Sequence, residues 1–526
     1  MYKVSREALD FALTHLTNRG DTDIFPAAFE LLAMDSDRDR LFEWLAGEDL
    51  DTWTTRQLRS CLTPKGVSGF RVATQLDPID AMLSTALVYE AGEDFERQRL
   101  GSDMVMSHRF APNESGGLFD SAYSFERFRL RSLELAEDYE YVVITDISDF
   151  YYRLYLHPIE NVMSMATTVD RARAIKKLLF GWNDSVSHGI PVGGAAMRLI
   201  AELAIDDVDQ SLRSEGVTFC RYSDDYRLFA TSEGAARRSL AHLADVLYRN
   251  HQLTLQAAKT EVLTAEEFNE RFHLGERDAV RHELMQGLEE LLEQLGIDSY
   301  NAPIDLDELD EGQITELEQL NLNEIVRQQA SSDQAVDFAL LRFALSSLQQ
   351  FGSFDIPPDE LDGYLEVLAP VIPHLVLALA ASTNEDDRVS VVEWLLSLRN
   401  HATIGHLPFN TSWLLHPFTL SRSWNCLDQV SDAFASASDD FVRTQAILAL
   451  GQGGAAHWFK REKQNLGRYG AWERRAILAG ASCLPGDEYV HWYRSIKSRL
   501  DDLEHYVVQW ARDGGLESLG TQSGVD

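Results

Sequence analysis

Apolar and polar residues recur with different periods along the chain, and the change of period predicts how it divides into domains. Apolar side chains have helical spacing over residues 5–13 and 25–34, as in amphipathic helices. Short runs of β-favouring residues then interrupt the helical pattern, and from about residue 276 these strand signals fade. We expect four segments: an N-terminal helical segment (1–54), a mixed α+β domain (55–275), an acidic helical linker (276–325) and an all-α domain (326–526).

The heptad Arg221–Arg227 (Arg-Tyr-Ser-Asp-Asp-Tyr-Arg) lies between two short β-favouring runs, 217–219 and 228–229. Strand, tight polar tip, strand is the simplest interpretation, with Asp224 and Asp225 at the tip of a hairpin. At a turn both carboxylates can reach toward one point, and such a point suits a hard divalent cation such as Mg²⁺. Taken alone, the heptad is equally compatible with an Asp-Asp turn in solvent.

Two other segments of the mixed domain contribute candidate residues. The apolar run 139–145 ends in Asp146, so a buried strand would deliver a carboxylate at its end, although Asp is also a common helix N-cap. The loop Gly189–Gly194 (Gly-Ile-Pro-Val-Gly-Gly) enters an apolar helix over 195–204. Its small residues allow a ligand or a nucleic-acid backbone to approach closely.

Cations flank predicted turns in two places. Residues 63–73 form a hairpin with a glycine-rich turn, which places Lys65 and Arg71 on its two arms. Such a pair could hold a triphosphate, Arg through its fork and Lys as a point charge. A solvated surface hairpin is the alternative. Lys259 is either a surface lysine or a further cation that reaches the triphosphate.

Composition limits the class of protein. A chain of 526 residues with 45% hydrophobic and 25% charged residues is expected to form two or three globular domains. We find no apolar run of about 18 residues and no signal peptide, so we expect no membrane span. The four cysteines lack CxxC or CxxH spacing, which favours a reduced, cytoplasmic protein without structural zinc.

The charge of the chain argues against one kind of partner. A formal net charge of −37 disfavours extensive nonspecific contacts with nucleic acid. Between residues 153 and 198, however, basic residues outnumber acidic ones, so a local basic channel stays possible.

The C-terminal half contains an internal repeat. Ala-Ile-Leu-Ala at 446–449 recurs at 476–479, and the His-Trp segment 457–463 recurs at 491–497. Paired helices at this period predict an αα solenoid, whose units bury their faces against their neighbours. We interpret the His-Trp pairs as core packing with a polar outer rim.

Over residues 55–270 the chain resembles the palm of reverse transcriptases. The resemblance lies in the order of three features: a strand-end acid, a Gly-Pro loop with its helix, and a Tyr-x-Asp-Asp hairpin. Asp146 matches the first metal-binding acid, and Tyr222–Asp225 matches the catalytic box. The other matches are Tyr151 for the aromatic residue beneath the incoming sugar, Gly189, Pro191 and Gly193 for the motif against template and nucleotide, Lys65 and Arg71 for the fingers pair, and Lys259 for the lysine motif.

The resemblance implies a fold, an activity and a cofactor. The fold is α+β, with right-hand polymerase fingers and palm followed by an all-α, HEAT-like repeat domain. The activity is that of an RNA-directed DNA polymerase, a nucleotidyltransferase that uses dNTPs. Two Mg²⁺ ions, or Mn²⁺ in their place, would be held by Asp146, Ile147, Asp224 and Asp225. The bulk of Tyr151 would exclude a 2′-hydroxyl.

Departures from the common pattern point to a subgroup. Ser223 stands where Ala is commonest, Val192 replaces the usual Gln, and an acidic helical region follows in place of a basic thumb. These features resemble the prokaryotic abortive-infection and "unknown group" defence-associated reverse transcriptases. That group implies anti-phage defence, single-stranded DNA made without a conventional template, a protein primer and a homo-oligomer.

Two other interpretations remain open. The polymerase could instead copy a conventional RNA template, a dedicated noncoding RNA. The palm could also be a catalytically silent scaffold whose helical array recruits a partner, although the presence of all three carboxylates argues against this.

Overall fold

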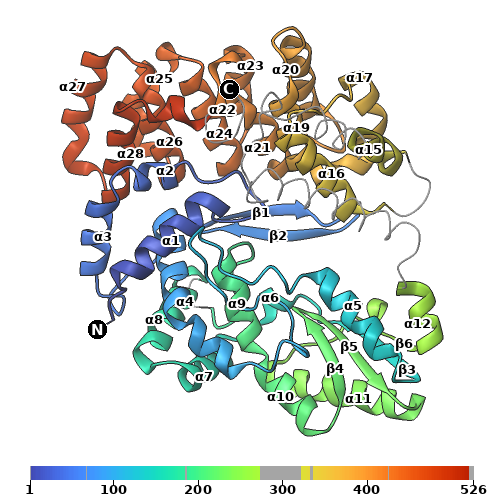
Figure 1. Cartoon of the computed structure of the whole chain (residues 1–526). Coiled ribbons are helices and arrows are strands. Elements are labelled where there is room, and N and C mark those ends of the chain that lie inside the picture. Colours follow the sequence, from blue (N-terminus) through green and yellow to red (C-terminus); the bar gives the residue numbers. More distant parts are fainter. Residues whose placement is uncertain are drawn as a thin grey trace. The chain divides into compact units, whose positions relative to one another are not determined.

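The computed structural model describes residues 2–66, 68–183, 186–272, 321–331, 336–424 and 426–520 (Figure 1). Almost all of the predicted acidic linker lies outside these residues. The chain forms two compact units that interleave along the sequence. Unit 1 comprises residues 1–23, 38–58 and 74–278, and unit 2 comprises 24–37, 59–73 and 279–526.

Unit 1 is built around a four-stranded antiparallel sheet with the strand order β4-β5-β3-β6. Its strands are β3 (Tyr141–Asp146), β4 (Thr218–Tyr222), β5 (Asp225–Ala230) and β6 (Glu261–Thr264). Successive strand residues face opposite sides. Val142 and Ile144 of β3 therefore point to one face, where they pack with Phe229, Phe128 and Phe268 in a hydrophobic core.

Helices cover both faces of this sheet (Figure 1). α5 (Phe125–Ala136) and α12 (Ala265–Phe272) supply Phe128 and Phe268 to the core described above. On the other face α11 (Glu233–Val246) packs against β5 and β3 and continues into the π-helix η1 (Leu247–His251).

The remaining helices of unit 1 surround a long central one, α4 (Pro78–Gln98), which contacts α1, α7, α8 and α9. α4 begins after Asp77, whose side chain accepts a hydrogen bond from the Ile79 amide. Pro78 suits the first helical position because it has no N–H that would lack a partner there. The other helices are α1 (Arg6–Arg19), α3 (Arg38–Gly47), α6 (Phe150–Arg153), α7 (Leu156–Ala166), α8 (Val169–Trp182), α9 (Ala195–Ala204) and α10 (Asp206–Ser214).

Unit 2 contains the β1–β2 hairpin (Arg59–Pro64 and Phe70–Gln75) up to residue 73, the short helix α2 (Glu30–Asp35) and the C-terminal helices. The helical spacing over 25–34 predicted a longer helix than α2. The first half of that range is not helical. The C-terminal helices are α15 (Leu322–Ala330), α16 (Phe338–Gln350), α17 (Pro358–Leu361), α18 (Leu365–Leu368), α19 (Ile372–Ser382), α20 (Arg388–Ser397), α21 (Pro408–Leu415), α22 (Pro417–Leu420), α23 (Leu427–Ser436), α24 (Asp440–Gln452), α25 (Ala456–Glu462), α26 (Ala471–Gly480), α27 (Gly486–Ile496) and α28 (Asp502–Arg512).

The helices of unit 2 contact one another in a chain of neighbours, α16 with α19, α19 with α21, α21 with α24, α24 with α26 and α26 with α28. The repeated Ala-Ile-Leu-Ala segments lie on α24 and α26, which pack directly against each other. Of the repeated His-Trp pairs, Trp458 is buried and His457 is exposed, whereas Trp492 is only half-buried. Core packing therefore describes the first pair better than the second.

One helical stretch of unit 2, Pro358–Ser382, passes a length and composition test for a membrane span, with a mean hydropathy of 1.8. The sequence had led us to expect no such run. Half of its most apolar window is buried inside the structure, and its last part, α19, packs against α16 and α21. Core helices of soluble proteins pass the same test.

The contact between α24 and α26 depends on two facing glycines. A Cβ built on Gly451 would lie 2.5 Å from Gly480 Cα, which is backbone and cannot turn away. We predict that Gly451→Ala lowers the free energy of unfolding of unit 2 by about 1–3 kcal/mol through overpacking, although Ala favours a helix. Gly467→Ala is the control, because nothing lies within 4 Å of its Cβ. Urea denaturation of both variants measures the difference, and equal midpoints would contradict the close packing.

Candidate active site

Two of the predicted acids face each other across the central pair of strands. Asp146 is the last residue of β3 and pairs with Asp225, the first residue of β5. Directly opposed residues of an antiparallel pair point to the same face, so the two carboxylates emerge side by side. Asp224 directly precedes Asp225 in the turn. The Asp224 carbonyl accepts a hydrogen bond from the Ile147 amide at 3.0 Å. The end of β3 is thereby attached to the Asp-Asp turn.

The turn itself is tight and conformationally unusual. Tyr222 pairs with Asp225, which leaves Ser223 and Asp224 as the two turn residues. Ser223 has a φ of 54°, in the left-handed region that costs a non-glycine residue about 1–3 kcal/mol. Such a conformation persists only where the surroundings hold it, and here both backbone groups of Ser223 have buried partners.

The side chain of Lys259 lies close to the three acids. The Lys259 Nζ is 2.5 Å from Asp146 Oδ2, and the side chains are 52% and 11% exposed, respectively. Partial burial by itself lowers the pKa of Lys259, but its hydrogen bond with Asp146 and the charges of Asp225 and Asp224 outweigh burial and raise it. One ammonium therefore senses all three carboxylates at once.

The chemistry of this donor set fits a hard divalent cation, because it consists of carboxylate oxygens from two adjoining strands. Within the described part of the chain, no three His, Cys, Asp or Glu side chains are gathered closely enough to hold a metal ion. In this structure the Lys259 ammonium donates a hydrogen bond to Asp146.

Tyr151 lies against the same turn. It belongs to α6, and its hydroxyl shares a hydrogen bond with the Ser223 side chain. Burial raises the pKa of Tyr151, and the negative charges of Glu202 and Asp224 add to the effect against the opposing charge of Arg198. Asp149 stands at the N-cap position of α6 without a capping bond and pairs with Arg153 at 3.2 Å.

The glycine-proline loop is attached to the segment that carries Tyr151. The Ile190 amide donates to the Tyr151 carbonyl at 2.9 Å, and the Gly189 amide donates to the Leu154 carbonyl at 2.8 Å. Gly189 has a φ of +90° and Gly193 a φ of +147°, which explains why glycine occupies both positions. Past Pro191 the loop leads directly into α9.

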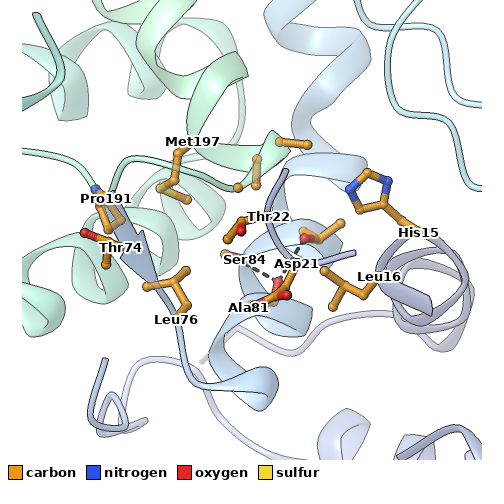
Figure 2. Close-up of a pocket in the computed structure, with 14 residues that line it drawn as sticks. His15, Leu16, Asp21, Thr22, Thr74, Leu76, Ala81, Ser84, Pro191 and Met197 are labelled. Carbon is orange, nitrogen blue, oxygen red and sulfur yellow. Dashed lines mark hydrogen bonds between the residues drawn. The ribbon is translucent and has the colours of Figure 1, made fainter. Parts of the chain in front are cut away.

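Two hollows adjoin these residues. A cavity of about 20 Å³ lies beneath the loop, where Figure 2 shows Pro191, Met197, Asp21 and Thr22 among its lining residues. That volume holds a single water at most.

An open hollow of about 570 Å³ has the size of a small-molecule site. It is lined by Asp149, Tyr152, Arg153, Tyr155, His188 and Gln252. It begins three residues beyond Asp146 in the sequence.

Unit 1 thus brings together Asp146, Ile147, Tyr151, Asp224, Asp225, Lys259 and the loop containing Gly189, Pro191 and Gly193. Lys65 and Arg71 belong to the hairpin of unit 2. The Lys65 amide donates to the Gly69 carbonyl at 2.7 Å, as expected for a tight turn. Their contact with a triphosphate stays a prediction.

The basic residues between 153 and 198 take part in ion pairs or hydrogen bonds. The partners are as follows: Arg171 with Asp94, Arg173 with Asp170, Lys176 with Glu160, Lys177 with the Asp51 carbonyl and Arg198 with Asp23. Asp94 and Asp23 come from other parts of the chain, whereas Asp170 and Glu160 lie within the segment itself.

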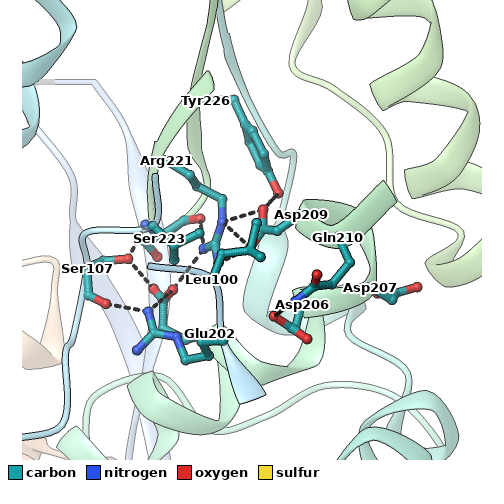
Figure 3. Close-up of polar contacts among 12 residues, drawn as sticks. Leu100, Ser107, Glu202, Asp206, Asp207, Asp209, Gln210, Arg221, Ser223 and Tyr226 are labelled. Carbon is teal, nitrogen blue, oxygen red and sulfur yellow. Dashed lines mark hydrogen bonds and ion pairs between the residues drawn. The ribbon is translucent and has the colours of Figure 1, made fainter. Parts of the chain in front are cut away.

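Sequence reasoning missed a buried ionic network behind the turn (Figure 3). Arg221 is fully buried and binds Glu202 at 2.8 Å and Asp209 at 2.6 Å. Burial alone would raise the pKa of Glu202, but Arg221 and Arg99 outweigh it and hold that pKa well below its usual range. The available signal was Glu202 itself, the one acid in the helix 195–204, where Arg198 is the only other charged residue.

Comparison with known proteins agrees with this site. Residues 97–286 match the family model described as "Reverse transcriptase (RNA-dependent DNA polymerase)". The match spans α5, the whole four-stranded sheet and the three acids, so this part of the chain is similar to a reverse transcriptase domain. No curated protein matches the chain.

Solved structures give weaker similarities. Telomerase from Candida albicans with a fragment of telomeric RNA is 9% identical with a TM-score of 0.32, over 68% of this chain and 66% of that one. Apo telomerase from Candida tropicalis is 9% identical with a TM-score of 0.31, over 87% of this chain and 68% of that one. The chain thus spans about two thirds of the length of these structures.

The loop before α9 offers a matched pair of variants. A Cβ on Gly193 would lie 2.9 Å from the Thr74 carbonyl oxygen, at a φ that L-residues avoid, whereas a Cβ on Gly194 would meet only the Asp21 carbonyl at 3.5 Å. We predict that Gly193→Ala lowers the free energy of unfolding by about 1–3 kcal/mol and that Gly194→Ala changes it little. Thermal and urea unfolding measure both. Equal stability of the two variants would contradict this loop conformation.

Proposed function

We propose that this chain is a DNA polymerase of the reverse transcriptase family that transfers nucleotides from dNTPs with the help of divalent cations. The observation that carries the proposal is the pairing of Asp146 with Asp225 at the Asp224 turn, inside the region that matches the family. Three carboxylates lie here against two cationic side chains, Lys259 at Asp146 and Arg227 at 4.0 Å from Asp225, and the excess negative charge attracts further positive charge.

Asp146, Asp224 and Asp225, with the backbone of Ile147, would hold Mg²⁺ or Mn²⁺. Cations bound there supply activation of the primer hydroxyl and neutralisation of charge on the leaving pyrophosphate. The protein contributes mainly positioning and electrostatics. Its sheet register orients Asp146 and Asp225 toward one point, and the bonded Ile147 amide keeps Asp224 beside them.

Other residues of the site would select and orient the nucleotide. Tyr151 lies against the catalytic turn, where its ring would exclude a 2′-hydroxyl and favour dNTPs over rNTPs. Lys259 would exchange its partner Asp146 for a phosphate oxygen when a nucleotide enters. Lys65 and Arg71 would supply the further cations for the triphosphate. The open hollow beside Asp149 and Tyr152 has room for part of such a ligand.

We further propose that the protein acts in the bacterial cytoplasm in anti-phage defence, as an abortive-infection type enzyme. The support is the sequence pattern of the loop with Val192, the absence of a basic thumb segment, and the helices that follow. The neighbour-to-neighbour contacts from α16 to α28 support a HEAT-like repeat domain. Untemplated, protein-primed single-stranded DNA synthesis by a homo-oligomer would follow from that membership.

The central prediction concerns Asp224. We expect Asp224→Asn to reduce incorporation of labelled dNTPs by more than about 100-fold, since partners outside the first coordination sphere alone contribute 10–100-fold. Circular dichroism and thermal unfolding should be unchanged, because Asp224 lies in a half-buried turn and the substitution keeps the shape of its side chain. Asp245→Asn, at an exposed acid of α11 paired with Arg249, is the control. Incorporation by a folded Asp224→Asn protein at the rate of the control would overturn the assignment.

A second experiment separates the modes of synthesis. Purified protein is incubated with Mg²⁺ and labelled dNTPs, without template or primer, and the product is resolved on a denaturing gel before and after protease treatment. We expect a product that depends on Asp224 and shifts on proteolysis. A product that forms only after RNA is added, or co-purified RNA of defined sequence, would favour the noncoding-RNA template. Absence of product under both conditions would favour the silent scaffold.

A further inference from the structure

The catalytic turn is held at both polar groups of its strained residue. The Ser223 amide donates to Ser107 Oγ at 2.8 Å, and the Ser223 carbonyl accepts from Arg221 Nη1 at 2.8 Å (Figure 3). These two bonds fix the peptide planes on either side of Ser223. The next two residues are Asp224 and Asp225, so the direction of both carboxylates depends on the Ser223 conformation.

Backbone pairing brings Ser107 to this position. β4 is an edge strand of the sheet, and residues 104–106 pair with its open side. The Arg221 amide donates to the Met104 carbonyl at 2.7 Å, and the Met106 amide donates to the Arg221 carbonyl at 3.0 Å. Ser107 is the residue that follows this pairing, and it therefore reaches the turn in a fixed register.

The hydroxyl of Ser107 has only one orientation open to it. Its Oγ donates to Glu202 Oε1 at 2.5 Å, which leaves the oxygen lone pairs to accept from the Ser223 amide. Glu202 is itself fixed, because its Oε2 accepts from Arg221 Nη1 at 2.8 Å and from Arg99 Nη2 at 3.0 Å. The side chains of Ser107 and Glu202 are buried, so water does not compete for these bonds.

Arg221 closes the network on the other side of the turn. Its Nε and Nη2 donate to Asp209 of α10, and Tyr226 Oη donates to the same carboxylate at 2.9 Å. The buried charges of Arg99 and Arg221 balance those of Glu202 and Asp209. In such a neutral, buried network each hydrogen bond limits the positions open to the neighbouring side chains. The last bonds of the network are those to the amide and the carbonyl of Ser223.

We propose that Ser107 is a positioning residue for the reaction: its hydroxyl, oriented by Glu202, holds the Ser223 peptide so that Asp224 and Asp225 face Asp146. This inference rests on the proposed function and adds to it a residue that lies outside the palm motifs. It also explains how α9, which follows the glycine-proline loop, is coupled to the catalytic turn, because Glu202 belongs to α9.

Ser107→Ala tests the proposal. It removes the acceptor of the Ser223 amide, and we expect kcat for dNTP incorporation to fall about 10–100-fold, as for other residues that orient metal ligands, with a smaller change in KM. The second readout is Mn²⁺ binding to the nucleotide-free protein, followed by electron paramagnetic resonance. The Mn²⁺ dissociation constant should rise, and Ser107→Thr, which keeps the hydroxyl, should restore both quantities in part.

Ser132→Ala is the matched control. Ser132 is also buried, and its hydroxyl contacts the Phe128 carbonyl at 2.8 Å and Cys220 Sγ at 3.4 Å, neither of which belongs to the turn residues Ser223 and Asp224. A general loss of stability would affect both Ala variants, whereas a positioning role affects Ser107→Ala alone. If Ser107→Ala does not fold, Ser107→Cys, which is similar in size and a weaker hydrogen-bonding group, takes its place with the same expectations.

The outcomes separate this inference from the proposed function. Wild-type kcat and Mn²⁺ affinity in a folded Ser107 variant, beside an inactive Asp224→Asn protein, would overturn the inference and leave the polymerase assignment intact. Absence of incorporation by the wild-type protein, with Mn²⁺ binding that does not depend on Asp224, would overturn the proposed function and this inference with it.

Discussion

The antiparallel register of β3 and β5 is the constraint on which the site depends. Because side chains alternate along a strand, a shift of one residue would turn Asp146 or Asp225 to the opposite face of the sheet. The register is fixed by the core beneath it, where Val142, Ile144 and Phe229 pack on one face. Hydrophobic packing several residues away therefore decides which acids meet.

Burying Arg99, Glu202, Asp209 and Arg221 behind the turn is expensive, since each ion loses its hydration. Paired charges in such a place add little net stability, but they define directions closely, because Arg presents its donors in a rigid fork. Here the fork fixes the carbonyl of Ser223, a residue that would otherwise leave its left-handed conformation. The main effect of the network is therefore to fix the conformation of the turn, and its contribution to the stability of the fold is small.

The charge distribution bears on how an acidic chain could act on nucleic acid. The net charge of −37 and the pairing of the basic residues between 153 and 198 leave few free cations in that segment. The carboxylate corner is itself negative, with Lys259 as its nearest ammonium. If the proposed function holds, bound cations would change the local field more than any side chain of the site, and nucleotide binding would depend on metal binding.

The sequence by itself determined the elements that carry the site. The run 139–145, the heptad Arg221–Arg227 and the Gly-Pro loop each have a local pattern, so the strand end, the hairpin and the helix 195–204 could be predicted residue by residue. Only the tertiary structure decided what lies around them. Ser107 and Asp209 have no local pattern, and their roles arise from strand pairing and from helix packing across the chain. The pairing of Lys259 with Asp146 is likewise long-range, because a contact over 113 positions is set by packing, which no local period encodes.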